Sequence, residues 1–202
     1  MKINIFGIRG NFIHDVIETC YRNKIRFRLI DNMEDTRNKK ELSVFTKYSW
    51  QLREINTILG LATPKAKKIG LNSAQNHGLT KFYNLVDKHS TIARFVEFGK
   101  GNYINAGVVI SPKVSINSFV TIDRGALIGH HVTIDDFCFI APGAIISGRV
   151  KIGKGTYIGA GAIIRDGITI GEDSVIGAGA VVVKDVAKNL TVVGNPAKTL
   201  VK

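Results

Sequence analysis

Large apolar residues recur at every sixth position through the second half of the chain. The series runs without an insertion from Ile92 to Val182, and 14 of its 16 members are isoleucine. Four residues after most of these positions stands a small or β-branched side chain, with Asn102 as a polar exception. A period of six fits neither a helix nor a simple alternating strand. It predicts short strands joined by regular turns and stacked as a solenoid, with the isoleucines inside.

The first half of the chain has a mixed pattern. The apolar run Ile3–Phe6 predicts a strand, Phe12–Asn23 has the apolar spacing of a helix, and Ile25–Ile30 predicts a second strand. Lys67–Leu71 is expected as a third strand, and Leu79–Lys88 as a helix that leads into the solenoid. These elements indicate a small α/β unit ahead of the repeat.

Composition changes where the repeat begins. Glycine is far more frequent after residue 90 than before it, and such a shift is typical of a domain boundary. We therefore expect a small α/β domain over residues 1–90 and a solenoid domain over residues 91–202. Residues 33–62 give no firm assignment, although Glu41–Leu59 has partly helical spacing.

A glycine-containing turn separates the first strand from the first helix. Gly7–Asn11 forms this turn, and Asp31-Asn32 follows the second strand. A glycine turn before a helix and an acid after the next strand are typical of half a nucleotide-binding βαβ unit, although the full G-x-G-x-x-G is missing. The helix N-terminus and backbone amides suit a diphosphate, and Asp31 suits a ribose or base donor. A tight strand–helix connection explains the turn equally simply.

Length and charge narrow the function classes. The chain has 202 residues and a net charge of +12, with basic residues scattered and without interleaved aromatics, so we expect anionic small ligands rather than nucleic acid. No apolar stretch approaches the length of a membrane span, and the N-terminal apolar run is too short for a signal peptide. Cys20 and Cys138 are too few for a disulfide framework or a metal knuckle. We expect a soluble cytoplasmic protein.

The hexads resemble those of the left-handed β-helix acyltransferases, and the whole chain resembles the NeuD/PglD-like sugar acyltransferases. The most specific stretches are Ile128–Phe137, Ile140–Ala144 and Val193–Lys198. The resemblance implies a mainly β protein, in which a left-handed parallel β-helix with three hexads per triangular coil follows a small βαβ nucleotide-binding-like domain. It also implies a homotrimer that binds acetyl-CoA between neighbouring prisms.

The resemblance implies transfer of acetyl from acetyl-CoA to the amino group of a nucleotide-linked amino sugar in surface-glycan synthesis. O-acetylation of sialic acid or a related sugar is the alternative reaction, and an inactive binding solenoid is the alternative without catalysis. A γ-type carbonic anhydrase needs three histidines around one metal ion, whereas the repeat contains only His130 and His131. We therefore expect no metal.

The catalytic histidine of this family corresponds to His130, whose place in its hexad points it outward. Imidazole is largely neutral at pH 7 and suits the role of general base. His131 stands where the family has an acid, and Asp123, Asp135 or Asp136 is a candidate to supply the missing carboxylate, within one chain or across a subunit boundary. Cys138 occupies an inward position, which favours core packing over acyl transfer.

The remaining site residues are also implied by the resemblance. Residues expected to bind the sugar nucleotide are Gly7, Arg9, Gly10, Asn11, Asp31, Asn32 and Gly70. Residues expected to contact acetyl-CoA are Phe139, Gly148, Ala160, Ala178 and Lys198. Phe139 departs from the family, which often has a histidine there, and Arg9 and Asn11 replace a common Ser-Gly-His turn.

Overall fold

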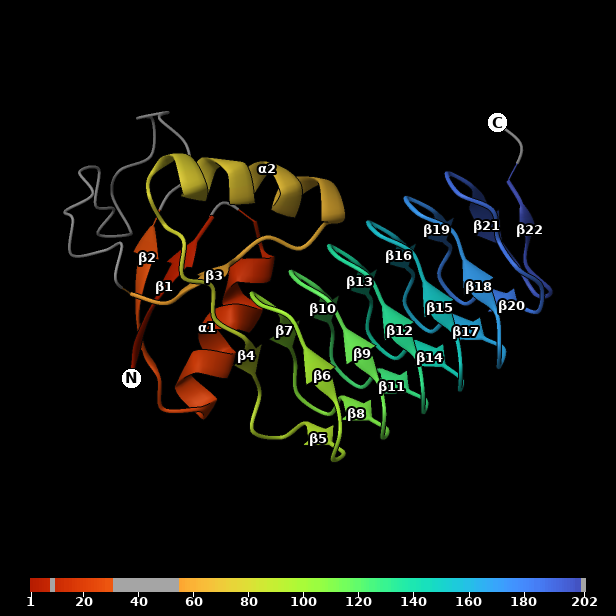
Figure 1. Cartoon of the computed structure of the whole chain (residues 1–202), viewed down its shortest axis with the longest axis horizontal. Coiled ribbons are helices and arrows are strands. Elements are labelled where there is room, and N and C mark those ends of the chain that lie inside the picture. The colour runs from red at the N-terminus through yellow and green to blue at the C-terminus, as the bar shows by residue number, and fades with distance from the viewer. Residues whose placement is uncertain (8–9, 31–54, 201–202) are drawn as a thin grey trace.

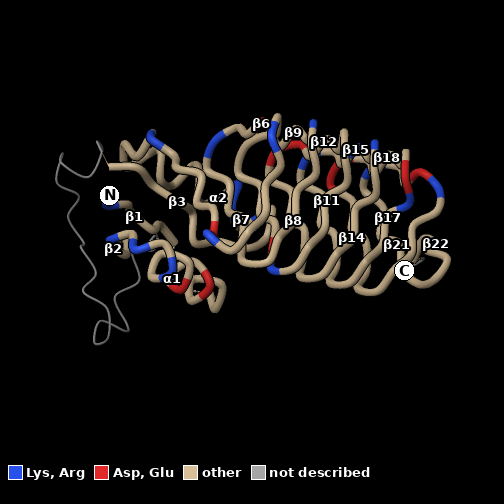
Figure 2. The backbone as a smooth tube through the Cα atoms, turned by 90° about the horizontal axis from the view of Figure 1, so that it is seen from below, with Lys and Arg blue, Asp and Glu red and all other residues tan. Residues whose placement is uncertain are grey.

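Two units make up the structure, a small α/β unit and a triangular prism of short strands, which extends away from it (Figure 1). The structure is a computed structural model that describes residues 1–7, 10–30 and 55–200. Within these residues the α/β unit, which contains both helices, lies against the first coils of the prism. The basic residues described are spread over both units and do not form a single patch (Figure 2).

The α/β unit contains a three-stranded parallel sheet in the order β2-β1-β3. Its elements along the chain are β1 (Lys2–Phe6), α1 (Phe12–Arg22), β2 (Arg26–Ile30), β3 (Thr57–Leu59) and α2 (Pro64–Asn76). The predicted β-α-β start is therefore confirmed. The buried side chains of β1, β3 and α1 form a common apolar core.

The predicted third strand at Lys67–Leu71 is wrong, because these residues lie inside α2. The Thr63 hydroxyl accepts a hydrogen bond from the backbone N–H of Ala66, and Pro64 occupies the first turn, so this helix has a strong start. The third strand is β3 instead, which lies in the stretch that gave no firm assignment and was partly helical in spacing.

The predicted helix at Leu79–Lys88 is also wrong. This segment is mostly extended, and β4 (Leu85–Val86) pairs in parallel with Tyr103 and Ile104, 18 residues further on. Val86 stands six residues before Ile92, so the hexad register continues backwards past the change in composition. The first coil of the prism thus starts before residue 91.

The prism has three faces, each a parallel sheet in which every strand pairs with a strand one coil later. Face 1 consists of β4, β7 (Tyr103–Ile104), β10 (Thr121–Ile122), β13 (Phe139–Ile140), β16 (Tyr157–Ile158), β19 (Val175–Ile176), β21 (Thr191–Val193) and the antiparallel β22 (Lys198–Thr199). Face 2 consists of β5 (Thr91–Ile92), β8 (Val109–Ile110), β11 (Leu127–Ile128), β14 (Ile145–Ile146), β17 (Ile163–Ile164) and β20 (Val181–Val182). Face 3 consists of β6 (Glu97–Phe98), β9 (Ser115–Ile116), β12 (Thr133–Ile134), β15 (Lys151–Ile152) and β18 (Thr169–Ile170).

The hexad residues fill the prism as predicted. From Ile104 to Val182 every one is buried, together with most of the small residues four positions later. The backbone turns each corner at the third residue after the hexad apolar position, where φ is positive, as at His131 (φ 58°) and Gly143 (φ 66°). The glycines directly after isoleucine serve another purpose. A Cβ at Gly129 would lie 2.7 Å from the backbone of Ser147 and Gly148 in the next coil, so these glycines permit close stacking of coils.

The α/β unit covers the first part of face 1. The ring of Phe12 on α1 lies edge-on to Tyr103 at 5.4 Å and to Phe139 at 6.3 Å between centroids. From α2, Lys67 reaches face 1 and Lys68 pairs with Asp173 at 2.9 Å. Face 1 is therefore an interface between the two units.

Candidate active site

His130 and His131 stand at the corner where the chain passes from face 2 to face 3, between β11 and β12. Both side chains are exposed, which confirms the outward position expected for His130. Their Nδ1 atoms are 3.0 Å apart, and the two rings are nearly perpendicular, at 87°. His131 has a left-handed backbone conformation, as the other residues at this position of each corner do. The corner thus presents two coupled imidazoles to solvent.

The contact between the two Nδ1 atoms constrains the tautomers. One Nδ1 must donate a proton and the other must accept it, because two lone pairs do not form a hydrogen bond. When His130 donates, its Nε2 is left with a lone pair and can act as a base. His131 can therefore orient the His130 ring and select its tautomer, as a carboxylate would, but it brings no negative charge.

Gly148 lies directly against the His130 ring, one coil further along the same corner. A Cβ at Gly148 would approach His130 Cε1 at 2.6 Å, His130 Nε2 at 2.8 Å and the Asp166 carboxylate at 2.8 Å. The backbone N–H of the next residue, Arg149, donates to the His130 carbonyl at 2.8 Å. Glycine at this position therefore leaves the space that the imidazole occupies.

The three carboxylates expected to replace the family's acid lie at other corners of this chain. Asp123 follows face 1, where it accepts a hydrogen bond from Asn105 at 2.8 Å. Asp135 and Asp136 follow face 3, where they accept hydrogen bonds from the Asn117 side chain and the Ser118 backbone at 2.9 Å. All three carboxylates therefore accept hydrogen bonds from a neighbouring coil.

The carboxylate that approaches the His130 ring across Gly148 belongs to Asp166, which the sequence reasoning missed. Asp166 follows His130 by two coils of 18 residues, and it forms an ion pair with Arg149. The spacing was readable in advance, because residues separated by multiples of 18 stack in one column of such a prism. Asp166 was missed because the family's acid directly follows its histidine, so only carboxylates near residue 131 in the sequence were considered.

The residues expected to bind the sugar nucleotide lie partly at the carboxyl edge of the N-terminal sheet. Gly7 directly follows β1 with φ at 90°, and a Cβ there would meet the Leu61 side chain at 2.8 Å. Gly70 faces the same leucine from α2, where a Cβ would approach it at 2.2 Å. Gly7 and Gly70 thus both pack against Leu61. The sequence analysis did not include Leu61 among the site residues.

Asn11 stands before the first turn of α1, and its side chain makes no capping hydrogen bond. Gly10 is exposed, and a Cβ there would meet nothing within 4 Å. Arg9, Asp31 and Asn32 lie outside the described residues. The described part of this edge therefore offers an open turn at the start of a helix, close to the end of β1.

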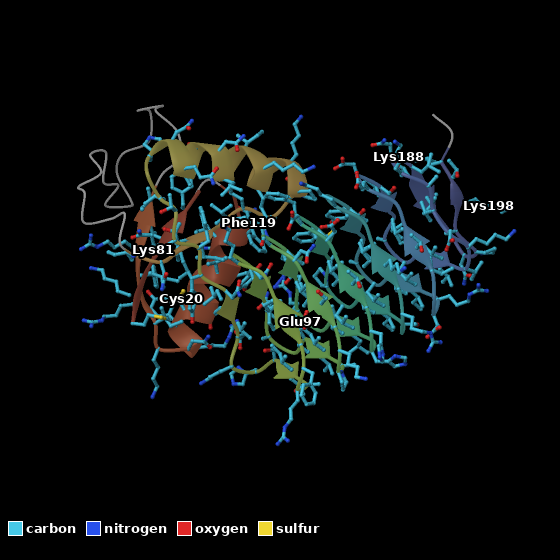
Figure 3. The ribbon with its side chains drawn as sticks, in the orientation of Figure 1. Cys20, Lys81, Glu97, Phe119, Lys188 and Lys198 are labelled. Carbon is cyan, nitrogen blue, oxygen red and sulfur yellow. The ribbon has the colours of Figure 1, made fainter. Side chains whose placement is uncertain are left out.

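The residues expected to contact acetyl-CoA fall into separate places on one chain. Gly148 shares the corner of His130, whereas Ala160 and Ala178 are exposed at the corner between faces 1 and 2, after β16 and β19. Phe139 is only 6% exposed on face 1 and stacks on Tyr157 with centroids 5.1 Å apart. Lys198 is exposed on β22, at the far end of the prism from the α/β unit (Figure 3).

Cys138 and the arrangement of potential metal ligands bear on two other kinds of chemistry. Cys138 is fully buried in the prism core, as expected, and burial raises the pKa of its thiol to about 12. Among the residues that the structure describes, no three histidine, cysteine, aspartate or glutamate side chains gather as a metal site would require. Neither helix seen in those residues has the length and apolarity to cross a bilayer.

Comparison with known proteins defines the class of fold. Residues 149–184 match the family model described as bacterial transferase hexapeptide (six repeats). Among curated protein sequences, none matches this chain significantly. The architecture is that of a left-handed β-helix of the hexapeptide transferase class, preceded by a small α/β domain, as the resemblance implied.

Solved structures resemble the chain over its whole length. PerB from Caulobacter crescentus, in complex with CoA and GDP-perosamine, is 24% identical with a TM-score of 0.87, over 100% of this chain and 98% of that chain. The acetyltransferase domain of PglB from Neisseria gonorrhoeae, in complex with acetyl coenzyme A, is 25% identical with a TM-score of 0.86, over 98% of both chains. WeeI from Acinetobacter baumannii is 24% identical with a TM-score of 0.85, over 99% of this chain and 100% of that chain. These matches confirm the resemblance to NeuD/PglD-like sugar acyltransferases.

Proposed function

We propose that this protein transfers the acetyl group of acetyl-CoA to the amino group of a nucleotide-linked amino sugar, with His130 as the general base. The observation that carries the proposal is the exposed His130–His131 pair over Gly148, on a fold shared from end to end with PerB, which binds CoA and GDP-perosamine. The acetyltransferase domain of PglB, in complex with acetyl coenzyme A, supports the same donor.

In the proposed reaction His130 carries out one proton transfer. His131 orients the ring through Nδ1, and His130 Nε2 takes the proton that the sugar amine loses as its nitrogen bonds to the acetyl carbon. The sulfur of CoA leaves as a thiolate, which regains a proton from His130 or water. Because nitrogen attacks the thioester directly, no protein nucleophile is needed, in agreement with the buried Cys138.

A homotrimer belongs to the proposal, and face 2 supports it. The outward residues of this face form an aliphatic stripe with exposed fractions of 37–42%, made of Val109, Leu127, Ile145 and Ile163. The outward residues of face 3 are polar instead, namely Glu97, Ser115, Thr133, Lys151 and Thr169. A row of exposed aliphatic residues of this kind is typical of a surface that packs against another subunit.

The trimer would also reunite the separated site residues. If face 2 of each prism points at a threefold axis, the corner that follows face 2 meets the corner that precedes face 2 on the next subunit. The first corner carries His130 and Gly148, and the second carries Ala160 and Ala178. The base and the residues expected to contact acetyl-CoA would then come from two subunits, with the proposed sugar-nucleotide site on an α/β unit.

The N-terminal unit is proposed to hold the nucleotide at the carboxyl edge of its sheet, with Gly7, Gly10 and Asn11 at the turn and Arg9, Asp31 and Asn32 beside it. Ligands of parallel α/β sheets bind at this edge, where helix N-termini attract phosphates. Acetyl-CoA is a cytoplasmic metabolite, and we therefore propose the cytoplasm as the site of action.

The test measures release of free CoA thiol from acetyl-CoA with UDP-, GDP- and dTDP-linked amino sugars and with sialic acid. We expect turnover with one nucleotide-linked amino sugar, and a loss of at least about 100-fold in kcat for His130→Ala. His89→Ala is the control, because His89 is an exposed histidine beside Asp87 that lies two coils before the coil of His130. Turnover with sialic acid alone would instead support O-acetylation, and full activity of His130→Ala would reject the proposed base.

A further inference from the structure

The carboxylate of Asp166 faces the base nitrogen of His130 across the backbone of one intervening coil. A methyl group built at Gly148 would lie 2.8 Å from both His130 Nε2 and Asp166 Oδ2, so these two atoms are separated by no more than twice that distance. No side chain stands between them, because the intervening residue is glycine. The arrangement therefore leaves a short direct path between a potential base and a negative charge.

The orientation of this carboxylate is fixed by its neighbour. Arg149 Nη2 donates to Asp166 Oδ1 and forms an ion pair with it. The other oxygen, Oδ2, is the one that points to Gly148 and the imidazole. Asp166 is 41% exposed, so water weakens its influence on the ring without removing it.

Other charges also face the histidine pair. His131 contacts His130 through Nδ1, and its backbone N–H donates to Pro112 of the preceding coil, where Lys113 shares the corner. Arg149 occupies the same corner position in the following coil. Further along the same corner stand Arg94, Arg165, Lys184 and Asp185. Among the described charged residues of this corner, Asp166 is the anion that approaches the His130 ring across Gly148.

We propose that Asp166 is the positioning residue that supplies the negative charge missing after His130. It stabilises the imidazolium that forms on His130 when Nε2 takes the amine proton, while His131 supplies the orientation. The two tasks of one carboxylate in the related enzymes are thereby divided between two residues. The catalytic part of this inference rests on the proposed function, whereas the electrostatic part does not.

The first test is the pH profile of kcat for Asp166→Asn. Loss of the anion disfavours the imidazolium, so more acid is needed to protonate the base, and the acidic limb moves to lower pH. Coulomb interaction at this separation in a water-like dielectric corresponds to a displacement of about half a pH unit. The kcat at the plateau should fall roughly threefold, because the base is weaker, and KM for acetyl-CoA should stay unchanged.

Two further variants separate charge from structure. Arg149→Gln removes a cation from the same corner, so its acidic limb should move to higher pH. Asp173→Asn makes the same change of charge at another corner, where Asp173 pairs with Lys68, and should leave the limb in place. Equal profiles for wild type, Asp166→Asn and Arg149→Gln would overturn the proposal.

The second test needs no substrate. The protein has 5 histidines, so a titration followed by NMR of ¹⁵N-labelled imidazole can resolve them individually. In Asp166→Asn we expect the His130–His131 signals to titrate about half a pH unit lower, with His14 and His89 unchanged. Unmoved signals would reject the inference even in an active enzyme. A shift in a protein that is inactive with every sugar would uphold the electrostatic link and reject only the proposed function.

Discussion

Lys67 projects from α2 into the seam between the α/β unit and face 1, and only 1% of it is exposed. Its Nζ donates to the carbonyl of Phe119 at 2.9 Å and to the hydroxyl of Thr121 at 2.5 Å. Burial lowers the pKa of this amine to about 7. A neutral amine has two hydrogens, which match these two acceptors. We predict that folding makes this lysine give up its proton near neutral pH.

The sign of the effect on stability follows from proton counting. The unfolded chain keeps the ordinary pKa of 10.5, so between pH 7 and pH 9 it binds a proton that the folded chain has largely lost. Stability rises with pH wherever the unfolded state binds more protons, by about 1.4 kcal/mol for each proton and pH unit. Over this window Lys67 should add about 2 kcal/mol to the free energy of unfolding. Below pH 7 both states become protonated, and the slope vanishes.

The assay is denaturant unfolding at pH 7, 8 and 9 for wild type, Lys67→Met and Lys65→Met, followed by circular dichroism. Methionine has a similar length and no charge, and Lys65 is an exposed lysine on the same helix. The difference in unfolding free energy between wild type and Lys67→Met should change by about 2 kcal/mol from pH 7 to pH 9. Cysteine titration is common to all three proteins and cancels. A constant difference would show that Lys67 stays charged in the folded protein and would refute the reasoning.

Three other changes test separate parts of the structure. Gly129→Ala places a methyl group 2.7 Å from the backbone of the next coil, so the unfolding free energy should fall by about 1–3 kcal/mol, measured by thermal unfolding. Leu127→Glu puts a charge on the apolar stripe of face 2, so light scattering should show monomers and the activity should be low. Thr133→Glu on face 3 is the control and should remain trimeric. An active Leu127→Glu monomer would reject the composite site. Gly148→Ala pushes a methyl group into the His130 ring, so kcat should fall at least tenfold while the melting temperature changes little; unchanged kcat would mean that the ring moves freely.

The prism was predictable because one physical requirement repeats in every coil. Each strand contributes one large inward side chain, and the hexad position meets that requirement from Ile104 onward with buried apolar residues. The same register would have located β4 through Val86, had it been extended backwards. Composition changes later than the fold does, so glycine content marked the boundary less well than the spacing of apolar residues.

Helix α2 was misassigned because its burial runs against residue type. Lys67 is buried, whereas Ile69, two residues later, is 59% exposed, so an apolar pattern assumed to face inward gives the wrong element. The start of the helix, Thr63-Pro64, was the better signal. Leu61 was missed for a related reason, because its contacts with Gly7 and Gly70 depend on how α2 packs and not on any local pattern.

The site shows the same division. The proposed base His130 was predicted from adjacent residues, because the family pattern is local in sequence. Asp166 could not be located that way, because its proximity arises from two complete coils of 18 residues between the two positions. A search of the column would have found it.

The unbroken 18-residue period builds the prism from successive coils of equal length. Height along the axis and position around it are independent coordinates, since each coil adds one strand spacing of about 4.8 Å without rotating the corners. Duplication of one coil between His130 and Ala160 would therefore increase their separation along the prism axis by one strand spacing. Every inward-facing residue would keep its place in the core. The fold can thus be adjusted to longer or shorter substrates by whole coils, with the chemistry of each corner left intact.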